Sequence, residues 1–235
     1  MEASIARPLA ADVRRLLWHR PELPWALLAC AAWLLVVLSH SLHPQARDVG
    51  DPASLPHWAG MTMATMLPAT LPMLRDVAQR SLWRRRYSAP AGFVTGYLAV
   101  WLAFGAIAIA LWSALGPHLS FEPETASAIV LAAGAPWSTN RWKARFLKGT
   151  HRELSLPARG LAAELACARY GAYHAGQCVG ACWPLMLAMV PWHGWALMLG
   201  ATAISSWERL ARRPRLRRCA AAIGALAALT VLGGL

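Results

Sequence analysis

The stretch Tyr170–Met186, "YGAYHAGQCVGACWPLM", has no charged side chain and is rich in apolar and small residues, as expected of a helix that lies within a lipid bilayer. It carries His174, Cys178 and Cys182 at intervals of four. At ~3.6 residues per turn, residues spaced by four lie almost above one another on a helix. The pattern therefore indicates either a ladder of metal ligands or a close-packing surface of small residues.

The composition favours an integral membrane protein. Of the 235 residues, 57% are hydrophobic and 14% are charged, and the mean hydropathy is +0.37. The charges lie in blocks between long uncharged runs, as in transmembrane helices joined by polar loops. One soluble core could not absorb these runs together with 13 Trp. We therefore predict an all-α, polytopic transmembrane helix bundle.

The apolar runs predict seven spans, with six as the alternative because the fourth and sixth runs are short. Pro68 and Pro72 lie inside the second run and predict a kinked helix there. The predicted spans cover about residues 24–42, 57–74, 90–115, 124–137, 170–190, 194–207 and 219–235.

The basic residues give an independent test of this topology. With a cytoplasmic N-terminus, the seven spans place on the inner side residues 1–23, 75–89, 138–169 and 208–218. These segments contain 22 of the 23 Lys and Arg residues, and only Arg47 falls outside them. Because cytoplasmic loops are enriched in Lys and Arg, this asymmetry supports the span count and the orientation.

The chain divides into a basic cytoplasmic N-terminal segment, 1–23, and one transmembrane domain, 24–235, with a basic interfacial loop at 138–169. In that loop basic residues alternate with aromatic ones, and we expect Trp142 and Phe146 at headgroup depth beside anionic lipid. The net charge of +12 is therefore explained by contact with the lipid bilayer, which is the expected partner. No nucleic-acid partner is expected.

On a helical wheel, Met186 and Met189 join His174, Cys178 and Cys182 in one stripe about 120° wide. Thiolate and thioether sulfur select soft ions such as copper(I), and imidazole also binds copper(II) and zinc. Cys and Met are equally common as small or adaptable packing residues, so packing remains the alternative. An ionisable residue inside a membrane segment usually has a functional role, so His174 favours the metal-ligand interpretation over packing.

The second span holds a further group of methionines. Met63, Met66 and Met73 share one face with Thr70, whereas Met61 points the other way. A methionine stripe at helical spacing can be packing or a set of metal ligands, and both interpretations stay open.

Four further features bear on the chemistry that the chain can carry out. Pro184 cannot donate a hydrogen bond to the carbonyl of Gly180, so the helix is expected to loosen beside the two cysteines. Glu208 and Arg209 are interpreted as a charge pair at a helix end. The sequence has no nucleotide-binding glycine motif, no G-x-S-x-G and no HExxH, so we do not expect an enzyme. The five Cys lie in or beside apolar runs, and no disulfide framework is expected.

Five histidines lie at or near the predicted outer boundary: His40, His43, His57, His118 and His193. We hypothesise that these outer histidines, with the outer methionines, collect a soft metal and pass it inward to Cys178 and Cys182. The alternative is that these histidines simply suit an interface.

The motifs "HWAGMTMATMLPATLPM", "GFVTGYLAVW", "GQCVGACWPLM" and "WERL" occur here in this order. Together they resemble the bacterial DUF2182 family, described as predicted metal-binding integral membrane proteins and sometimes labelled copper chaperones. The resemblance runs from about His57 to the C-terminus and implies a multi-pass protein of the bacterial inner membrane with a metal site.

This chain departs from that family at two places. Members commonly have G-x-x-C-x-G-C-C-W, and here Ala181 replaces the first of the two adjacent cysteines. Many members also carry C-L-x-x-C-R after the fourth span, where this chain has Phe146 and Thr150. The comparison thus implies a divergent member with a reduced set of thiols.

We therefore predict a membrane protein that binds or hands on a soft metal, copper above all, through Cys178 and Cys182. The secondary ligand candidates are His174, Met186, Met63 and Met66. The expected partner is a copper-dependent membrane or periplasmic protein. The alternative is a membrane scaffold or accessory subunit without metal, in which Gly171, Cys178 and Cys182 pack against another helix.

Overall fold

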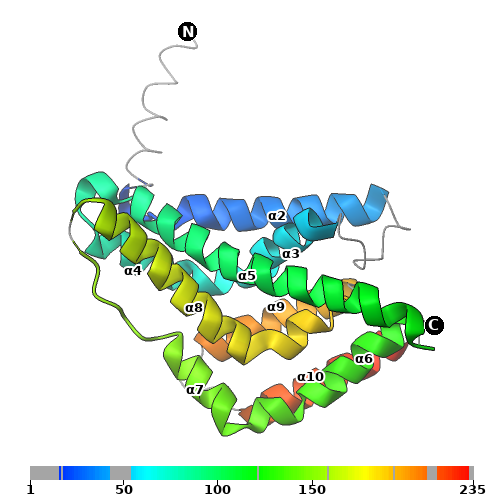
Figure 1. Cartoon of the computed structure of the whole chain (residues 1–235). Helices are drawn as coiled ribbons and strands as arrows, with labels where there is room; N and C mark the ends of the chain where they lie inside the picture. The colour runs from blue at the N-terminus through cyan, green and yellow to red at the C-terminus, as the bar shows by residue number, and fades with distance from the viewer. Residues whose placement is uncertain are drawn as a thin grey trace.

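The computed structural model describes residues 16, 18–42, 54–120, 122–157, 159–192, 194–210 and 216–232. These residues form helices joined by short connections, with no strand among them, and so confirm the all-α fold class (Figure 1). The α-helices are α2 (Leu23–Leu42), α3 (Leu55–Met66), α4 (Leu71–Arg80), α5 (Ser88–Leu115), α6 (Pro123–Gly134), α7 (Arg141–Gly149), α8 (Leu161–Leu187), α9 (Trp195–Leu210) and α10 (Leu216–Leu232). Short 3-10 helices lie between them: η2 (Pro68–Thr70), η3 (Trp83–Arg85), η4 (Gly116–His118) and η5 (Pro136–Thr139).

Each predicted span coincides with a helical segment. The second span is divided into α3, η2 and α4, and the break falls at Pro68, as its two prolines predicted. Pro68 is the first residue of η2 and Pro72 the second of α4. Neither proline costs a hydrogen bond, because backbone nitrogens in the first turn have no intrahelical partner in any helix.

Helix length and composition separate α5 from the other helices. Among the described residues, only the continuous segment Ser88–His118 is both long and apolar enough to cross a membrane, and a shorter apolar helix covers Leu23–Leu38. The polytopic bundle of seven spans therefore stays a prediction.

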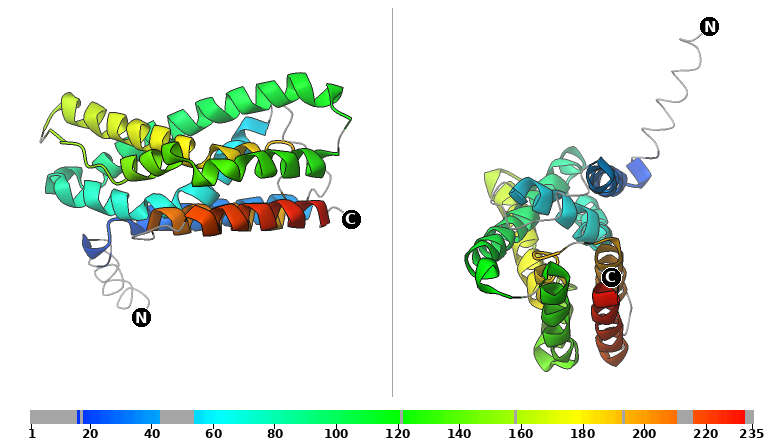
Figure 2. Two further views of the ribbon diagram at one scale, coloured as in Figure 1. Left: turned by 90° about the horizontal axis from the view of Figure 1, so that it is seen from below. Right: turned by 90° about the vertical axis from the view of Figure 1, so that its right-hand side faces the viewer.

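The long helices run roughly parallel to one another (Figure 2, left). In that view the end of α4 and the starts of α5 and α8 lie at one end of the bundle, and the ends of α2, α5 and α10 lie at the other. The predicted inner segments 75–89 and 138–169 border the first of these ends. The arrangement is the one that alternating spans would produce.

Helices α5 and α8 share the most extensive helix–helix contact in the described part of the chain. Two glycines lie where the backbones cross. A Cβ atom at Gly96 would lie 1.9 Å from the carbonyl oxygen of Ala168, and one at Gly171 would lie 1.8 Å from that of Phe93. Only residues without a side chain fit this approach, as at small-residue crossings in membranes. The packing predicted for Gly171 is thus made within the chain itself.

An ion pair joins these helices at the end where both begin. Arg85 of η3 donates to Glu164 of α8 at 2.9 Å, and Ser88 of α5 donates to the same oxygen at 3.2 Å. The hydrogen bond from Arg85 lowers the pKa of the Glu164 carboxyl and so favours its charged form.

The basic loop forms the short helix α7. Trp142 is 47% exposed and lies beside the guanidinium of Arg145, in agreement with an interfacial position. Phe146 is half-buried and packs against Cys182 and Ala181 of α8, and its position at headgroup depth stays a prediction. A Cβ at Gly180 would meet that ring at 2.5 Å, which shows how closely α7 lies on α8.

Replacing Gly171 by Ala tests the crossing. The added methyl would collide with backbone and must push the helices apart, so we expect a loss of about 1–3 kcal/mol in the free energy of unfolding. Thermal unfolding in detergent, followed by tryptophan fluorescence, measures the change. Gly176→Ala on the same helix is the matched control, because its Cβ would meet no atom within 4 Å. Equal stability of the two variants would contradict the close crossing.

Candidate metal centre

The predicted stripe on α8 faces the interior. Cys178, Cys182, Met186 and Met189 are completely buried, and His174 is 4% exposed. Four of these residues lie within α8, whereas Met189 follows its end at Leu187. All five cysteines of the chain are free thiols in the structure.

Pro184 leaves the carbonyl oxygen of Gly180 without its helical donor, as the sequence predicted. The indole Nε1 of Trp137 donates to that oxygen at 3.1 Å. The side chain of Pro184 fills the space beside Gly134 of α6, where a Cβ would come within 2.3 Å of it. The helix therefore continues to Leu187 past the two cysteines, because a neighbouring side chain satisfies the freed carbonyl.

A buried arginine lies against the two thiols. The Nη2 atom of Arg209 is 2.6 Å from the Sγ of Cys178 and 3.8 Å from the Sγ of Cys182. The same nitrogen is 3.2 Å from the Sδ of Met66. Arg209 is 3% exposed, and its Nε and Nη1 atoms have no hydrogen-bond partner among the described residues. A cation thus lies among three sulfur atoms.

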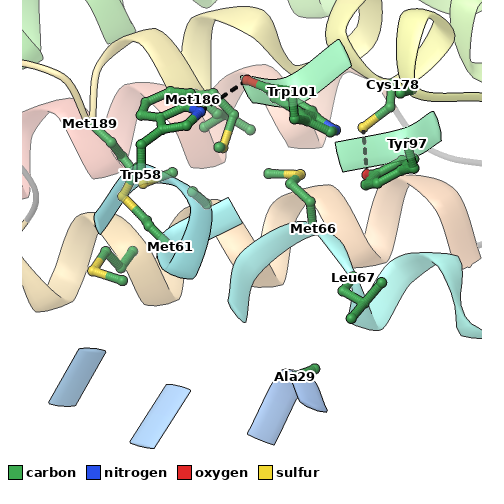
Figure 3. Close-up of a cluster of buried hydrophobic side chains, with 14 of the residues drawn as sticks. Ala29, Trp58, Met61, Met66, Leu67, Tyr97, Trp101, Cys178, Met186 and Met189 are labelled. Atoms are coloured by element: carbon green, nitrogen blue, oxygen red, sulfur yellow. Dashed lines mark hydrogen bonds between the residues drawn. The ribbon is translucent and has the colours of Figure 1, made fainter. Parts of the chain in front are cut away.

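Tyr97 of α5 completes this group. Its hydroxyl is 3.3 Å from the Sγ of Cys178, a contact drawn as a dashed line in Figure 3. Figure 3 also shows Met66 of α3 and Met186 of α8 in the same buried cluster as Cys178. Four helices, α3, α5, α8 and α9, therefore each contribute a side chain around the two cysteines.

The methionines of the second span are placed unequally. Met66 is buried and contacts Arg209, whereas Met63 is half-buried and none of the described polar contacts links it to the cysteines. Met61, which the wheel placed on the other face, is also fully buried. Met186 lies one helical turn beyond Cys182, and the hydroxyl of Thr65 is 3.9 Å from its sulfur. Of these methionines, Met66 is thus the one that the described contacts place closest to the two thiols.

His174 lies one helical turn before Cys178, among aromatic rings. Its ring centroid is 5.6 Å from that of Phe93 and 6.0 Å from that of Tyr97. Neither ring nitrogen has a hydrogen-bond partner among the described residues. The imidazole therefore lies beside Tyr97, whose hydroxyl contacts Cys178.

The outer histidines enter the described structure only in part. His118 is exposed and His57 is half-buried. The side chain of His40, and the whole of His43 and His193, lie outside the described residues. Collection of metal by these histidines stays a hypothesis.

The interpretation of Glu208 and Arg209 as a pair is wrong. Glu208 instead accepts from the Nζ of Lys143 at 2.6 Å, and both side chains are buried. Lys143 also donates to the hydroxyl of Ser138 at 3.1 Å. Adjacent residues on a helix point in directions about 100° apart, so Glu208 faces α7 while Arg209 faces α8.

Arg209, Tyr97 and Lys143 were not among the predicted site residues. For Arg209 a signal was present, since Glu208 and Arg209 adjoin an apolar helix and adjacent residues do not face each other. This geometry excludes an ion pair between Glu208 and Arg209, and it implies that each of the two side chains has a different buried partner. Nothing in the sequence marks Tyr97 or Lys143 in this way.

The donor set is suited to a soft ion. Two thiols and the thioether of Met66 meet at one point, and such sulfur ligands favour copper(I) over harder ions. In the part of the chain that the structure describes, no group of three or more His, Cys, Asp or Glu side chains is placed to hold a metal ion. Any metal bound here would therefore depend on thioether sulfur as well as on thiols.

A comparison with protein families identifies the class of protein to which this centre belongs. Residues 55–233, most of the chain, match the model of the PpoB2 family, described as a copper chaperone. The chain belongs to this family. No curated protein and no solved structure matches it. The family assignment supports a copper-related function for this chain.

The Lys143–Glu208 pair is expected to be essential for stability. Removing one partner leaves the other charge buried and unpaired, so Lys143→Met should lower the free energy of unfolding by about 3–5 kcal/mol. The double variant Lys143→Met/Glu208→Gln should recover much of this loss because no charge is then left alone. Thermal unfolding in detergent measures both. Glu153→Ala breaks an exposed pair with Arg80 and serves as control, with a loss of about 0–1 kcal/mol. A single variant as stable as that control would contradict the prediction.

Proposed function

We propose that this protein is a copper chaperone of the bacterial inner membrane that binds copper(I) through Cys178 and Cys182, with Met66 as a third sulfur ligand. The observation that carries the proposal is the meeting of these three sulfur atoms around the side chain of Arg209. His174, Met186 and Met63 remain secondary candidates that extend the site along the same helices. We assign the protein no enzymatic activity.

The membership in a copper-chaperone family supports the choice of copper over other soft metals. The ordered motifs that resemble DUF2182 proteins support a bacterial multi-pass protein, of which this chain is a divergent member. The cargo is handed to a copper-dependent membrane or periplasmic protein, since a chaperone acts by delivery.

The surface of the described helices supports a place within the bilayer. Large apolar side chains face outward along α2, α5 and α10, for example Leu35 at 67%, Ile107 at 62% and Leu229 at 54% exposure. Soluble monomers rarely expose apolar surface over several helices, whereas lipid-facing surfaces require it. The basic residues gathered in the predicted inner segments support the orientation.

A scaffold without metal is the alternative that the sequence left open. The close packing of Gly171 on α5 accounts for one residue of the small-residue face. It does not account for two thiols and a thioether placed around a single buried cation. The sulfur group therefore favours metal binding.

Replacing both cysteines tests copper binding. Titration of purified protein with copper(I) against a coloured chelator should show one ion bound per chain. Cys178→Ser/Cys182→Ser should lose this binding by about two orders of magnitude in affinity or more, because hydroxyl oxygen is a poor ligand for a soft ion. Serine is close in size to cysteine, so the packing is retained.

Cys30→Ser is the matched control for that titration. Cys30 is exposed on α2 and lies outside the sulfur group, so its loss should leave the affinity unchanged. Equal copper binding by the double variant and this control would overturn the proposed site. Met66→Leu should weaken binding less than the loss of both thiols.

Reporter fusions test the proposed topology. Alkaline phosphatase is active only outside the cytoplasm, so a fusion after residue 50 should be active. A fusion after residue 155 should be inactive, because the positive-inside rule places the basic loop in the cytoplasm. The same activity at both positions would contradict the alternating spans.

A further inference from the structure

We propose that Arg209 is an internal competitor for copper: its guanidinium takes the position of the metal among the sulfur atoms, leaves when the metal binds, and returns when the metal is released. This inference deepens the proposed function and rests on it. It assigns a role to a residue that the metal ligands alone do not explain.

The position of the guanidinium is the first argument. Its Nη2 atom lies within 3.8 Å of all three sulfur atoms, those of Cys178, Cys182 and Met66. A metal ion bound to protein sulfur lies about 2.3 Å from it. An ion at bonding distance from these atoms would overlap the Nη2 atom. Arg209 and the metal therefore cannot occupy the site together.

The second argument is that little else holds Arg209 in place. It is 3% exposed, and its Nε and Nη1 atoms have no hydrogen-bond partner among the described residues. The neighbouring carboxylate of Glu208 is bound to Lys143 and not to Arg209. A buried guanidinium with unsatisfied donors is costly. The sulfur contacts thus hold a side chain that has no carboxylate of its own in the described structure.

The third argument is the position of Arg209 close to the end of its helix. Arg209 is the next-to-last residue of α9, which ends at Leu210. The predicted inner segment 208–218 begins here, and the positive-inside rule places this helix end at the cytoplasmic side of the membrane. Because arginine has a long flexible stem, rotation of the side chain can carry the guanidinium toward that end while its backbone stays in place.

Charge determines which cargo fits this exchange. A guanidinium carries one positive charge, and copper(I) or silver(I) carries the same charge. The thiolate is the form of cysteine that binds a metal, so each thiol that still carries its proton releases it to solvent when the ion enters and Arg209 leaves. A monovalent ion then replaces the positive charge that the guanidinium takes away. Two thiols and a thioether also select soft ions, so the inferred cargo class is the soft monovalent cations.

The exchange also explains how a buried ion can be handed on. Two thiols and a thioether hold copper(I) tightly, and a chaperone must nevertheless release it. When Arg209 returns to the sulfur atoms, it stabilises the metal-free site and lowers the barrier to departure. Arg209 is in this sense a positioning residue for release and not a metal ligand.

Chemical modification of the wild-type protein tests the displacement directly. Phenylglyoxal modifies accessible arginine, and peptide mass spectrometry measures the extent at Arg209. We expect Arg209 to be protected without metal and to become modified when one equivalent of copper(I) or silver(I) is bound. Arg152 is exposed and should react equally in both states, so it is the internal control. Continued protection of Arg209 in fully loaded protein would overturn the inference.

Substitution tests the effect on release. Arg209→Leu removes the competing cation, so transfer of copper(I) to an excess of chelator should slow by about tenfold or more, because affinity changes appear mostly in dissociation rates. Arg209→Lys keeps a positive charge and should stay close to the wild-type rate. A purely structural arginine predicts the opposite, namely that Arg209→Leu releases copper faster or at an unchanged rate.

The two proposals fail in different ways. The metal content of each sample is measured before modification. Wild-type protein that takes up no copper(I) or silver(I) would reject the proposed function, and this inference with it. Wild-type protein that loads fully while Arg209 stays protected would reject the inference alone and leave the copper site standing.

Discussion

The close crossing of α5 and α8 is the constraint on which the rest of the structure depends. Gly96 and Gly171 allow the two backbones to touch, since a methyl group at either position would overlap a carbonyl oxygen. This contact brings Tyr97 to within 3.3 Å of the Sγ of Cys178. Helices α3 and α9 then pack around the pair and bring Met66 and Arg209 to the same point. A wider crossing would separate the groups of the candidate metal centre.

Two buried cations, Arg209 of α9 and Lys143 of α7, have different kinds of partner. Lys143 has a carboxylate at 2.6 Å and a hydroxyl at 3.1 Å, an arrangement that satisfies its charge and joins α7 to α9. Arg209 has sulfur atoms where Lys143 has oxygen atoms. Oxygen partners hold a lysine permanently, whereas soft sulfur atoms bind a soft metal better than a guanidinium. Lys143 therefore suits a structural role, and Arg209 suits exchange with a metal ion.

Much of the fold follows from local patterns. Long apolar runs predict the helices, and Pro68 marks where the second segment breaks into α3, η2 and α4. The loss of the helical donor at Gly180 also follows from Pro184. The donor that replaces it, Trp137, could not be predicted because it comes from 43 residues away in the chain. Likewise the wheel separated Met61 from Met66, yet both are buried, since several helices surround α3.

The sequence alone determined that this chain is helical, that Cys178 and Cys182 share one face of a helix, and that this face carries further soft donors. Helical periodicity is local, so residues four apart share a face whatever surrounds them. Only the tertiary structure decided which groups meet the thiols. In the structure Met66, and not Met63, contacts Arg209 beside the thiols. Glu208 faces Lys143, and Arg209 lies among the sulfur atoms. These pairings join helices far apart in sequence, and their geometry depends on how closely Gly96 and Gly171 let the helices approach.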